Sequence, residues 1–198
     1  MHFLFDNIVA SIVGAVILLV MVATHHRNQL ASIEATSYYM LQQQVLDFTS
    51  TIQRDMQNLS SIQTLKESAD TTETGYVGKF VFRAQTSPTD TTKRLITYRR
   101  KNAGVRQRKG QANIKLYQVV RLVDGNMTGG SIATLTSWSI QGLNEAGNSA
   151  SSLGDVKQIK VSMAAATPIE VVTPDGVTIR DTRWESTFRP RMLRDDPL

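Results

Sequence analysis

The strongest constraint on this chain is an apolar segment that continues without a break into an amphipathic one. Phe3 to Ala23 is almost wholly apolar, and Ile8 to Ala23 contains no charged side chain. As a helix, the 21 residues from Phe3 to Ala23 would extend about 30 Å, which matches the hydrocarbon core of a bilayer. We therefore expect residues 1–28 to form a membrane-length helix that needs a cover of lipid or of other protein chains.

The amphipathic segment follows directly and predicts the second half of the same helix. Its apolar residues recur every three or four positions, which places them on one stripe of an α-helix. The first 87 residues contain no proline that would break the helix. We expect the amphipathic half to span residues 29–66. The stripe consists of Leu30, Ile33, Leu41, Val45, Phe48, Ile52, Met56, Leu59 and Ile62, and the residues expected on the outer faces include Gln42, Gln43, Gln44, Thr49, Gln53, Arg54, Asp55 and Gln57.

Residues 70–198 have the pattern of a β-rich domain. The stretch 70–78 is rich in turn-forming residues, and alternating apolar and polar runs follow it, separated by Gly, Pro, Asn and Asp. We expect five to seven antiparallel strands and an α+β fold in which the amphipathic half-helix packs on an antiparallel sheet. The expected strands are Lys79–Gln85, Arg94–Arg100, Ile114–Val123, Ile132–Ile140, Val156–Met163 and Val177–Arg189.

Enzyme chemistry is the least favoured class. The chain has no cysteine, and its three histidines, His2, His25 and His26, lie in or beside the apolar segment. No Gly-rich phosphate loop or paired-histidine metal pattern is present. We therefore expect no catalytic residue, metal or cofactor. Asp124-Gly125 is explained as a hairpin turn. Calcium held by Asp124 and Asn126 is a further alternative, against which the small number of oxygen ligands nearby in the sequence argues.

A basic cluster in the middle of the chain is the best candidate for a binding surface. We favour the interpretation that the cluster is a solvated hairpin, which pairs with acidic groups on neighbouring subunits or on a cell surface. It could also bind nucleic acid through phosphate attraction, although only Tyr98 offers an aromatic platform nearby. The residues proposed for this anion-binding surface are Arg99, Arg100, Lys101, Arg106, Arg108 and Lys109.

Asp6 is the one acidic residue in the apolar segment, where a carboxylate is costly unless it is paired or reaches the interface. Two interpretations stay open. Asp6 or Asn7 could cap the N-terminus of the helix, where the dipole favours negative charge. Alternatively, Asp6 could neutralise a positive group of a neighbouring copy, most simply an α-amino group.

The layout resembles the type IV pilin superfamily, which includes pilins and the pseudopilins of type II secretion. Tyr39 to Phe48 and Ile52 to Met56 are similar to the glutamine-rich, then Leu/Phe-rich, then Arg-Asp segment of large minor pilins and J-type pseudopilins. Leu95 to Tyr98, Leu116 to Val120 and Ser186 to Arg191 resemble strands of the same proteins. The resemblance implies a long helix whose first half is embedded in the membrane and whose second half packs on an antiparallel sheet.

The resemblance also implies a role for the N-terminal residues. Phe3-Leu4-Phe5-Asp6 is a loose counterpart of the Phe-Thr-Leu-Ile-Glu that follows the leader of prepilins, with Asp6 in place of the glutamate. Asp6, Phe3 and Phe5 would then set the register between subunits. The expected packing residues of the filament core are Ile8, Val9, Ile12, Val13, Val16, Ile17, Leu19 and Val20.

The expected function is therefore that of a structural subunit of a helical pilus or pseudopilus filament. Its partners would be further copies or other pilin-like subunits. Its location would be the bacterial inner membrane and then an extracellular or periplasmic filament. Two alternatives remain: a minor pseudopilin at the tip, which primes assembly or secretion, and a single-pass membrane subunit of an unrelated complex.

Overall fold

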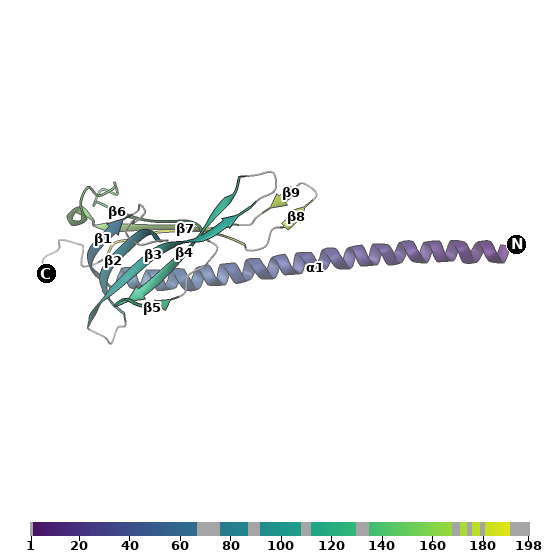
Figure 1. Cartoon of the computed structure of the whole chain (residues 1–198), viewed down its shortest axis with the longest axis horizontal. Helices are drawn as coiled ribbons and strands as arrows, with labels where there is room; N and C mark the ends of the chain where they lie inside the picture. Colours follow the sequence, from purple (N-terminus) through teal and green to yellow (C-terminus); the bar gives the residue numbers. More distant parts are fainter. Residues whose placement is uncertain are drawn as a thin grey trace. The chain divides into compact units, whose positions relative to one another are not determined.

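The computed structural model describes residues 2–66, 76–86, 92–107, 112–129, 135–167, 171–173, 176–178 and 181–190. A single unbroken helix, α1 (His2–Gln57), opens the chain and is followed by the strands of a sheet (Figure 1). Contacts within the chain define two compact units, residues 1–40 and 41–198. The second unit contains the end of α1 and all of the described strands.

The main sheet has eight strands, all of them paired antiparallel, in the order β1-β2-β3-β4-β6-β7-β10, with β5 also paired to β4. β8 and β9 form a separate two-stranded hairpin. The α+β fold class is thus confirmed. The strands are β1 (Leu59–Lys66), β2 (Tyr76–Gln85), β3 (Lys93–Arg106), β4 (Ile114–Val123), β5 (Asn126–Gly129), β6 (Leu135–Leu143), β7 (Gln158–Ala166), β8 (Val171–Thr173), β9 (Gly176–Thr178) and β10 (Asp181–Phe188).

The end of α1 packs on the sheet through one apolar stripe, as its spacing predicts. Leu41, Val45, Phe48, Ile52 and Met56 are all buried. They meet the inward-facing side chains of the sheet, among which the rings of Tyr98 and Trp138 lie 6.3 and 5.7 Å from that of Phe48. Removing this apolar surface from water holds the helix segment and the sheet together.

The helix ends earlier than expected. We predicted helix to residue 66, but α1 ends at Gln57 and Leu59–Lys66 is strand β1. β1 carries two register shifts against β2, so that its inward residues Leu59, Ile62 and Leu65 pair with Ala84, Phe82 and Phe80 at intervals of three. Each bulge inserts an extra residue. The bulges therefore replace the usual strand period of two with a spacing that reads as helical.

The number of strands was also underestimated, because the described residues form ten strands rather than five to seven. β1 was read as helix, and β5, β8 and β9 are only three or four residues long. The run expected from Val177 to Arg189 divides between β9 and β10, and β3 continues past Arg100 to Arg106.

Two turns clarify the remaining boundaries. Tyr76–Gly78, expected as part of a turn, begins β2 at a register shift where Gly78 has φ 95°. Asp124 and Gly125 have φ of 50° and 85° and connect β4 to β5. Positive φ at both central residues is typical of a tight hairpin turn, as the Asp-Gly pair predicts. The other Asp-Gly turn includes Asp175, which lies outside the described residues.

Candidate functional site

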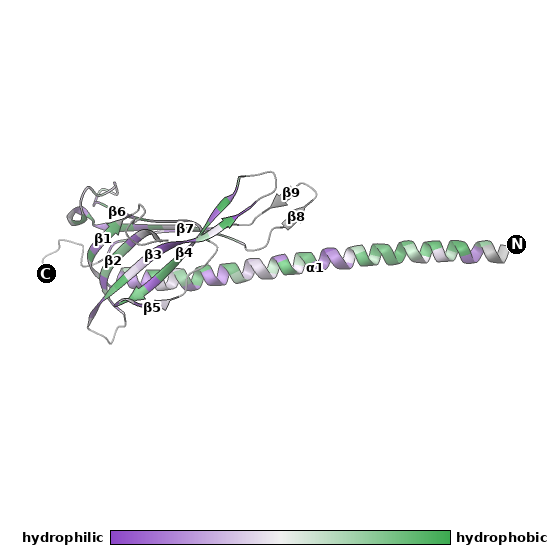
Figure 2. Cartoon of the chain, in the orientation of Figure 1, coloured by the Kyte–Doolittle hydropathy of each residue, from purple (hydrophilic) through white to green (hydrophobic). Residues whose placement is uncertain are grey.

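The apolar segment of α1 is the most unusual surface of the described chain. Every large apolar side chain from Phe5 to Val22 is between 51 and 74% exposed. Figure 2 shows this hydrophobic stretch along the N-terminal part of α1. By length and composition the helix is long and apolar enough to cross a membrane. Within the part of the chain that the structure describes, these side chains have no cover.

The two hydroxyl side chains in or beside this segment are satisfied within the helix. Ser11 Oγ donates to the carbonyl of Asn7 at 2.8 Å, and Thr24 Oγ1 donates to the carbonyl of Val20 at 2.8 Å. A polar group in hydrocarbon has no water to bond, so internal bonding removes most of its cost there. Both hydroxyls are therefore compatible with an apolar environment.

The predicted filament-core residues, from Ile8 and Val9 to Leu19 and Val20, fall on one half of the helix circumference. Their side chains are all exposed, as are Leu18, Met21 and Val22 outside that set. Phe5 is 74% exposed. Phe3 lies in α1, but its side chain lies outside the described part of the chain.

Asp6 is exposed and lies inside α1, not at its N-terminus. The helix begins at His2, and its first turn contains no acidic residue. The interpretation of Asp6 or Asn7 as a helix cap is therefore wrong, since both follow the positions at which backbone N–H groups lack partners. The alternative, a pairing of Asp6 with a neighbouring copy, stays a prediction.

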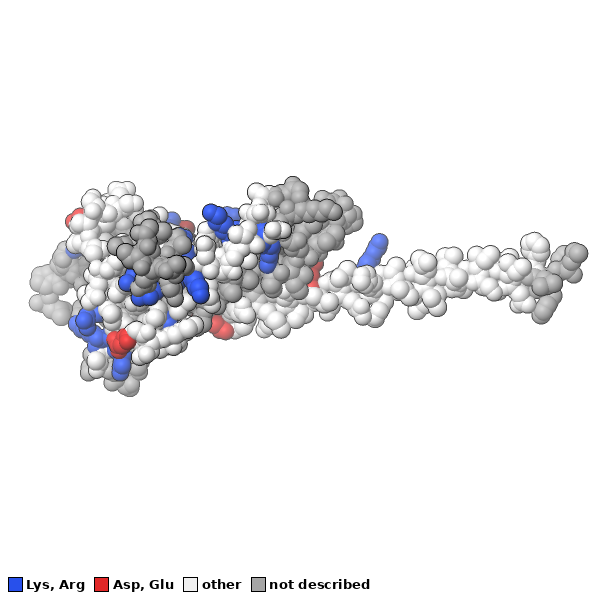
Figure 3. Space-filling view, in the orientation of Figure 1, with Lys and Arg blue, Asp and Glu red and all other residues white. Residues whose placement is uncertain are grey.

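The four described residues of the predicted anion-binding surface lie on β3, but not all on one face of the sheet. Arg99, Arg100 and Lys101 follow one another in β3, so Arg100 points to the opposite face of the sheet from the other two. Figure 3 shows Lys and Arg side chains spread over the visible face. Arg108 and Lys109 lie outside the described residues. Arg99, Lys101 and Arg106 share a face, because they pair with Val120, Gln118 and Ile114 of β4 across the bulge between Asn102 and Gly104. The anion-binding surface stays a prediction.

Two residues of this set bind backbone carbonyls. Arg100 Nη1 donates to the carbonyl of Trp138 at 2.9 Å, and its guanidinium lies 4.9 Å from the centre of the Tyr117 ring. Arg106 Nη1 donates to the carbonyl of Thr167 at 2.7 Å. Arg100 and Arg106 therefore connect β3 to other parts of the domain.

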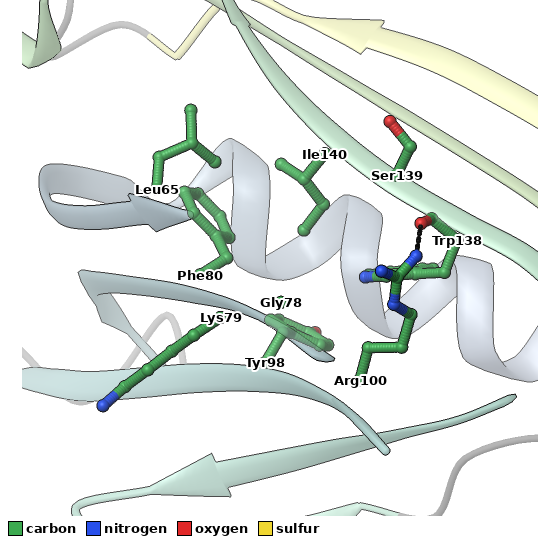
Figure 4. A pocket seen from close by; sticks show the side chains of 9 residues that line it. All are labelled: Leu65, Gly78, Lys79, Phe80, Tyr98, Arg100, Trp138, Ser139 and Ile140. Atoms are coloured by element: carbon green, nitrogen blue, oxygen red, sulfur yellow. Dashed lines mark hydrogen bonds between the residues drawn. The ribbon is translucent and has the colours of Figure 1, made fainter. Parts of the chain in front are cut away.

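A cavity of about 190 Å³ lies beside Arg100 (Figure 4). Phe80, Tyr98, Trp138 and Ile140 are among its lining residues, and the bond from Arg100 to the Trp138 carbonyl lies at its edge. Lys79 contributes to the wall, but its side chain points away from the other labelled residues. The lining contains no pair of groups suited to acid–base or nucleophilic chemistry, and we assign the cavity no function.

A buried polar network, which the sequence did not reveal, connects α1 to the sheet. Asp55 has no exposed surface, and Arg121 on β4 is only 6% exposed. Arg121 donates to Asp55 from Nε at 2.6 Å and from Nη2 at 2.9 Å, and Tyr98 Oη donates to the same carboxylate at 2.7 Å. Arg121 Nη1 also donates to Thr128 Oγ1 at 2.8 Å. The exposed Arg54 is 4.0 Å away.

The prediction that Thr49 and Asp55 face outward is therefore wrong. Both are buried, and Thr49 Oγ1 donates to the carbonyl of Leu46 at 2.9 Å. Asp55 lies next to Met56 and three residues after Ile52, so its helical position falls at the margin of the apolar stripe. That position was the available signal. The choice of Arg121 as its partner depends on a contact across 66 residues of sequence.

Burial and bonding shift two pKa values in this network. Burial, with the neighbouring charge of Asp55 and the hydrogen bond to it, raises the pKa of Tyr98 well above 10.0. Burial alone would lower the pKa of Arg121, but its hydrogen bonds to Asp55 and the charge of Asp55 raise that pKa above its ordinary value. Tyr98 is thus held neutral and Arg121 charged.

The carboxylate of Asp124, considered above as a calcium ligand, is already engaged with groups of β3. Asp124 Oδ1 accepts the backbone N–H of Leu95 at 2.9 Å, and Asp124 Oδ2 lies 3.4 Å from Arg94 Nη1. Among the described residues no group of three or more His, Asp or Glu side chains is arranged to hold a metal ion.

Comparisons of the chain with protein-family models, with curated proteins and with solved structures found no match.

Proposed function

We propose that this chain is a structural subunit of a pilin-like helical filament, which is anchored in a membrane before assembly by the apolar segment of α1. The long helix on an antiparallel sheet is compatible with a pilin-like fold. The observation that carries the proposal is the continuity of α1, whose first half is exposed and apolar and whose last turns belong to the core of the domain.

The exposed apolar segment requires a cover. Burying one Val, Leu or Ile side chain contributes about 1.5–3 kcal/mol, so leaving the whole segment in water costs on the order of 20 kcal/mol. That exceeds the net stability of a typical domain, about 5–15 kcal/mol. Lipid can cover the segment before assembly, and the same segment of sister subunits can cover it afterwards.

Helix continuity favours a filament subunit over a simple anchor. A membrane anchor needs only its apolar segment, which a flexible linker could join to the domain. Here one helix without a break includes both the exposed apolar residues and the buried stripe from Leu41 to Met56. A continuous helix transmits the position of a packed helix bundle to the attached domains, which is what a regular polymer requires.

The proposal is tested by shearing material from the surface of cells that express the whole chain. We expect filaments in the sheared fraction by electron microscopy, and this chain in them by mass spectrometry, which also reads the amino terminus. Asp6→Ala is expected to reduce filament yield while leaving membrane insertion and folding intact. Asp47→Ala, which changes an exposed acid of the same helix outside the apolar segment, is the matched control.

Other outcomes would favour the alternatives. The internally bonded Ser11 and Thr24 suit a permanent membrane span equally well. A stable hetero-complex in detergent without any filaments would therefore support a single-pass membrane subunit. Filaments that contain this chain only at one end would support a minor tip subunit. Normal filaments from the Asp6→Ala variant would contradict the role of Asp6 in register.

A further inference from the structure

The two outermost strands of the main sheet, β1 and β10, differ in how well they could accept a further strand. β1 carries two register shifts against β2, and bulges of this kind turn an edge away from new partners. β10 pairs with β7 over eight consecutive residues without a shift, and it contains no proline. Within the described chain, no backbone hydrogen bond reaches the other side of β10. β10 is therefore a regular strand with one open edge.

The side chains of β10 alternate between the two faces of the sheet. Asp181, Arg183 and Glu185 are exposed on one face, and their charges alternate in sign. On the other face, Trp184 is only partly buried, and its ring lies 6.2 Å from that of Phe188. Charges of a single sign would repel a second copy of the strand, whereas charges of both signs at every second residue can be neutralised by one.

We propose that β10 pairs with β10 of a second copy, antiparallel, about a two-fold axis at Trp184. In this register Arg183 of each copy lies opposite Glu185 of the other, so the axis produces two ion pairs. Thr182 lies opposite Ser186 in the same way. Opposite charges and hydroxyl groups that face each other directly stabilise antiparallel strands.

Two features of β10 that do not involve charge support the same register. Thr182 Oγ1 is buried and has no hydrogen-bond partner in the described chain, and the pairing places the hydroxyl of Ser186 of the second copy opposite Thr182. The partly buried Trp184 would meet the Trp184 of the second copy across the axis. The pairing thus supplies a hydroxyl partner and a further apolar contact at the open edge.

The neighbouring registers are less favourable. An axis at Arg183 would set the two Arg183 side chains against each other and Asp181 against Glu185. An axis at Glu185 would set the two Glu185 side chains against each other. Like charges that lie directly opposite destabilise an antiparallel pair. An axis at Thr182 would pair Asp181 with Arg183, but it would leave Glu185 opposite a residue that precedes β10.

The two-fold axis also determines the direction of the two copies. It is perpendicular to the sheet and therefore reverses every element that lies along the sheet. The last turns of α1 lie along it through the stripe from Leu41 to Met56, so these turns run in opposite directions in the two copies. Neighbours within one filament, or within one membrane, point the same way. The pairing would therefore join copies of two filaments or of two facing membranes, and it does not rest on the proposed function.

Introduced cysteines test the register, because the chain has no cysteine of its own. The full chain in detergent is prepared as two variants, Thr182→Cys and Ser186→Cys, which are mixed under mild oxidation. Opposite residues of antiparallel strands have Cα atoms about 4.5–5.5 Å apart, within the reach of a disulfide. We expect a crosslinked dimer from the mixture and none from either variant alone, because two copies of Thr182 would lie about 13 Å apart.

The matched control mixes Thr182→Cys with Thr187→Cys. Residue 187 would lie next to residue 182 across the pair, but its side chain points to the other face of the sheet, so no crosslink is expected. A mixture of Thr182→Cys and Ser186→Cys that gave no dimer would overturn the proposal. A dimer from Thr182→Cys alone would place the axis at Thr182 and would overturn it too.

Vesicles that carry the full chain with its domain outward test the pairing without crosslinks. We expect them to cluster, as measured by light scattering. Arg183→Glu should slow the clustering about tenfold, because it sets two glutamates against each other at two positions. Arg183→Glu with Glu185→Arg should restore the clustering, because the exchange keeps both opposite-charge pairs.

Lys115→Glu makes the same change of net charge at an exposed residue of β4 and should cluster like the wild type. Clustering that Arg183→Glu left unchanged, or that the exchanged variant failed to restore, would contradict the pairing. None of these readouts requires a filament, and filaments can form without this pairing. The proposal and the proposed function can therefore fail separately.

Discussion

At the scale of single residues, two carboxylates connect elements of the domain, one of them buried and the other exposed. Asp55 accepts bonds from Arg121 and Tyr98, and Asp124 accepts bonds that hold the start of β3 to the turn after β4. β1 to β4 carry Lys and Arg but no Asp or Glu. Among the described residues, two carboxylates that meet this basic half of the sheet are Asp55 of α1 and Asp124 of the β4–β5 turn.

Tyr98→Phe tests the network at this scale. The variant loses a hydrogen bond to a charged carboxylate, so we expect the free energy of unfolding at pH 7 to fall by about 1.5–3 kcal/mol. Because the pKa of Tyr98 is raised in the folded state, its contribution is complete below pH 10 and is lost as the pH rises above that value. The difference between wild type and variant should therefore narrow above pH 10.

Denaturant unfolding of the full chain in detergent, measured between pH 7 and pH 11, checks this expectation. Tyr39→Phe is the matched control, because Tyr39 is 67% exposed and its replacement should change the stability little at any pH. A difference for Tyr98→Phe that stayed constant from pH 8 to pH 11 would contradict the raised pKa.

At the scale of elements, the contact between β1 and β6 shows how closely the sheet is packed. Gly142 on β6 has no room for a side chain. A Cβ atom there would lie 2.7 Å from Val156 Cγ2 and 2.9 Å from Leu65 Cδ2. Leu65 has a flexible end, but Val156 is branched at Cβ and has few rotamers to move into. A glycine in β6 is thus required by close approach.

Gly142→Ala is expected to lower the free energy of unfolding by about 1–3 kcal/mol, the usual cost of overpacking a core. The measurement is the midpoint of thermal or denaturant unfolding. Gly154→Ala is the control, because the nearest atom to its Cβ position is Ser152 Oγ at 3.8 Å. If Gly142→Ala and Gly154→Ala unfolded at the same midpoint, β1 and β6 would be able to move apart around the added Cβ atom without loss of stability.

At the scale of the whole molecule, the exposed apolar segment determines the environment in which the chain is stable. The segment has no cover within the described chain, whereas residues 41–198 contain a core of their own. We therefore expect the chain to be held by membranes until an assembled partner replaces the lipid.

Lysines placed in the apolar segment test this expectation. Val13→Lys together with Ile17→Lys should move most of the chain out of membranes, because each lysine near the centre of a span costs about 2.5–3.5 kcal/mol. The readout is the fraction retained in membranes after washing at alkaline pH. Gln42→Lys with Gln53→Lys, both on exposed positions of α1, should remain in the membrane fraction. Equal retention of the two variants would contradict a membrane span.

The sequence by itself determined the elements whose signal is local. The apolar run and the stripe from Leu41 to Met56 predict α1, because helical periodicity over many turns is rarely accidental. Alternation predicts most of the strands of the α+β fold, and Asp124-Gly125 predicts its hairpin. The exposed apolar segment was foreseen for the same reason, since no domain of this size covers a helix of that length.

Only the tertiary structure decided the features that depend on distant partners. The spacing of Leu59, Ile62 and Leu65 predicts a helix, although these residues lie in strand β1. Two bulges, which the pairing with β2 determines, place the inward-facing residues of β1 three positions apart. Asp55 read as a surface residue because its partner, Arg121, lies 66 residues away. The pattern of apolar residues along the sequence indicates which side chains are buried from water. A charged side chain can be buried only where the fold places a residue of opposite charge beside it. That pairing is a property of the assembled sheet and helix.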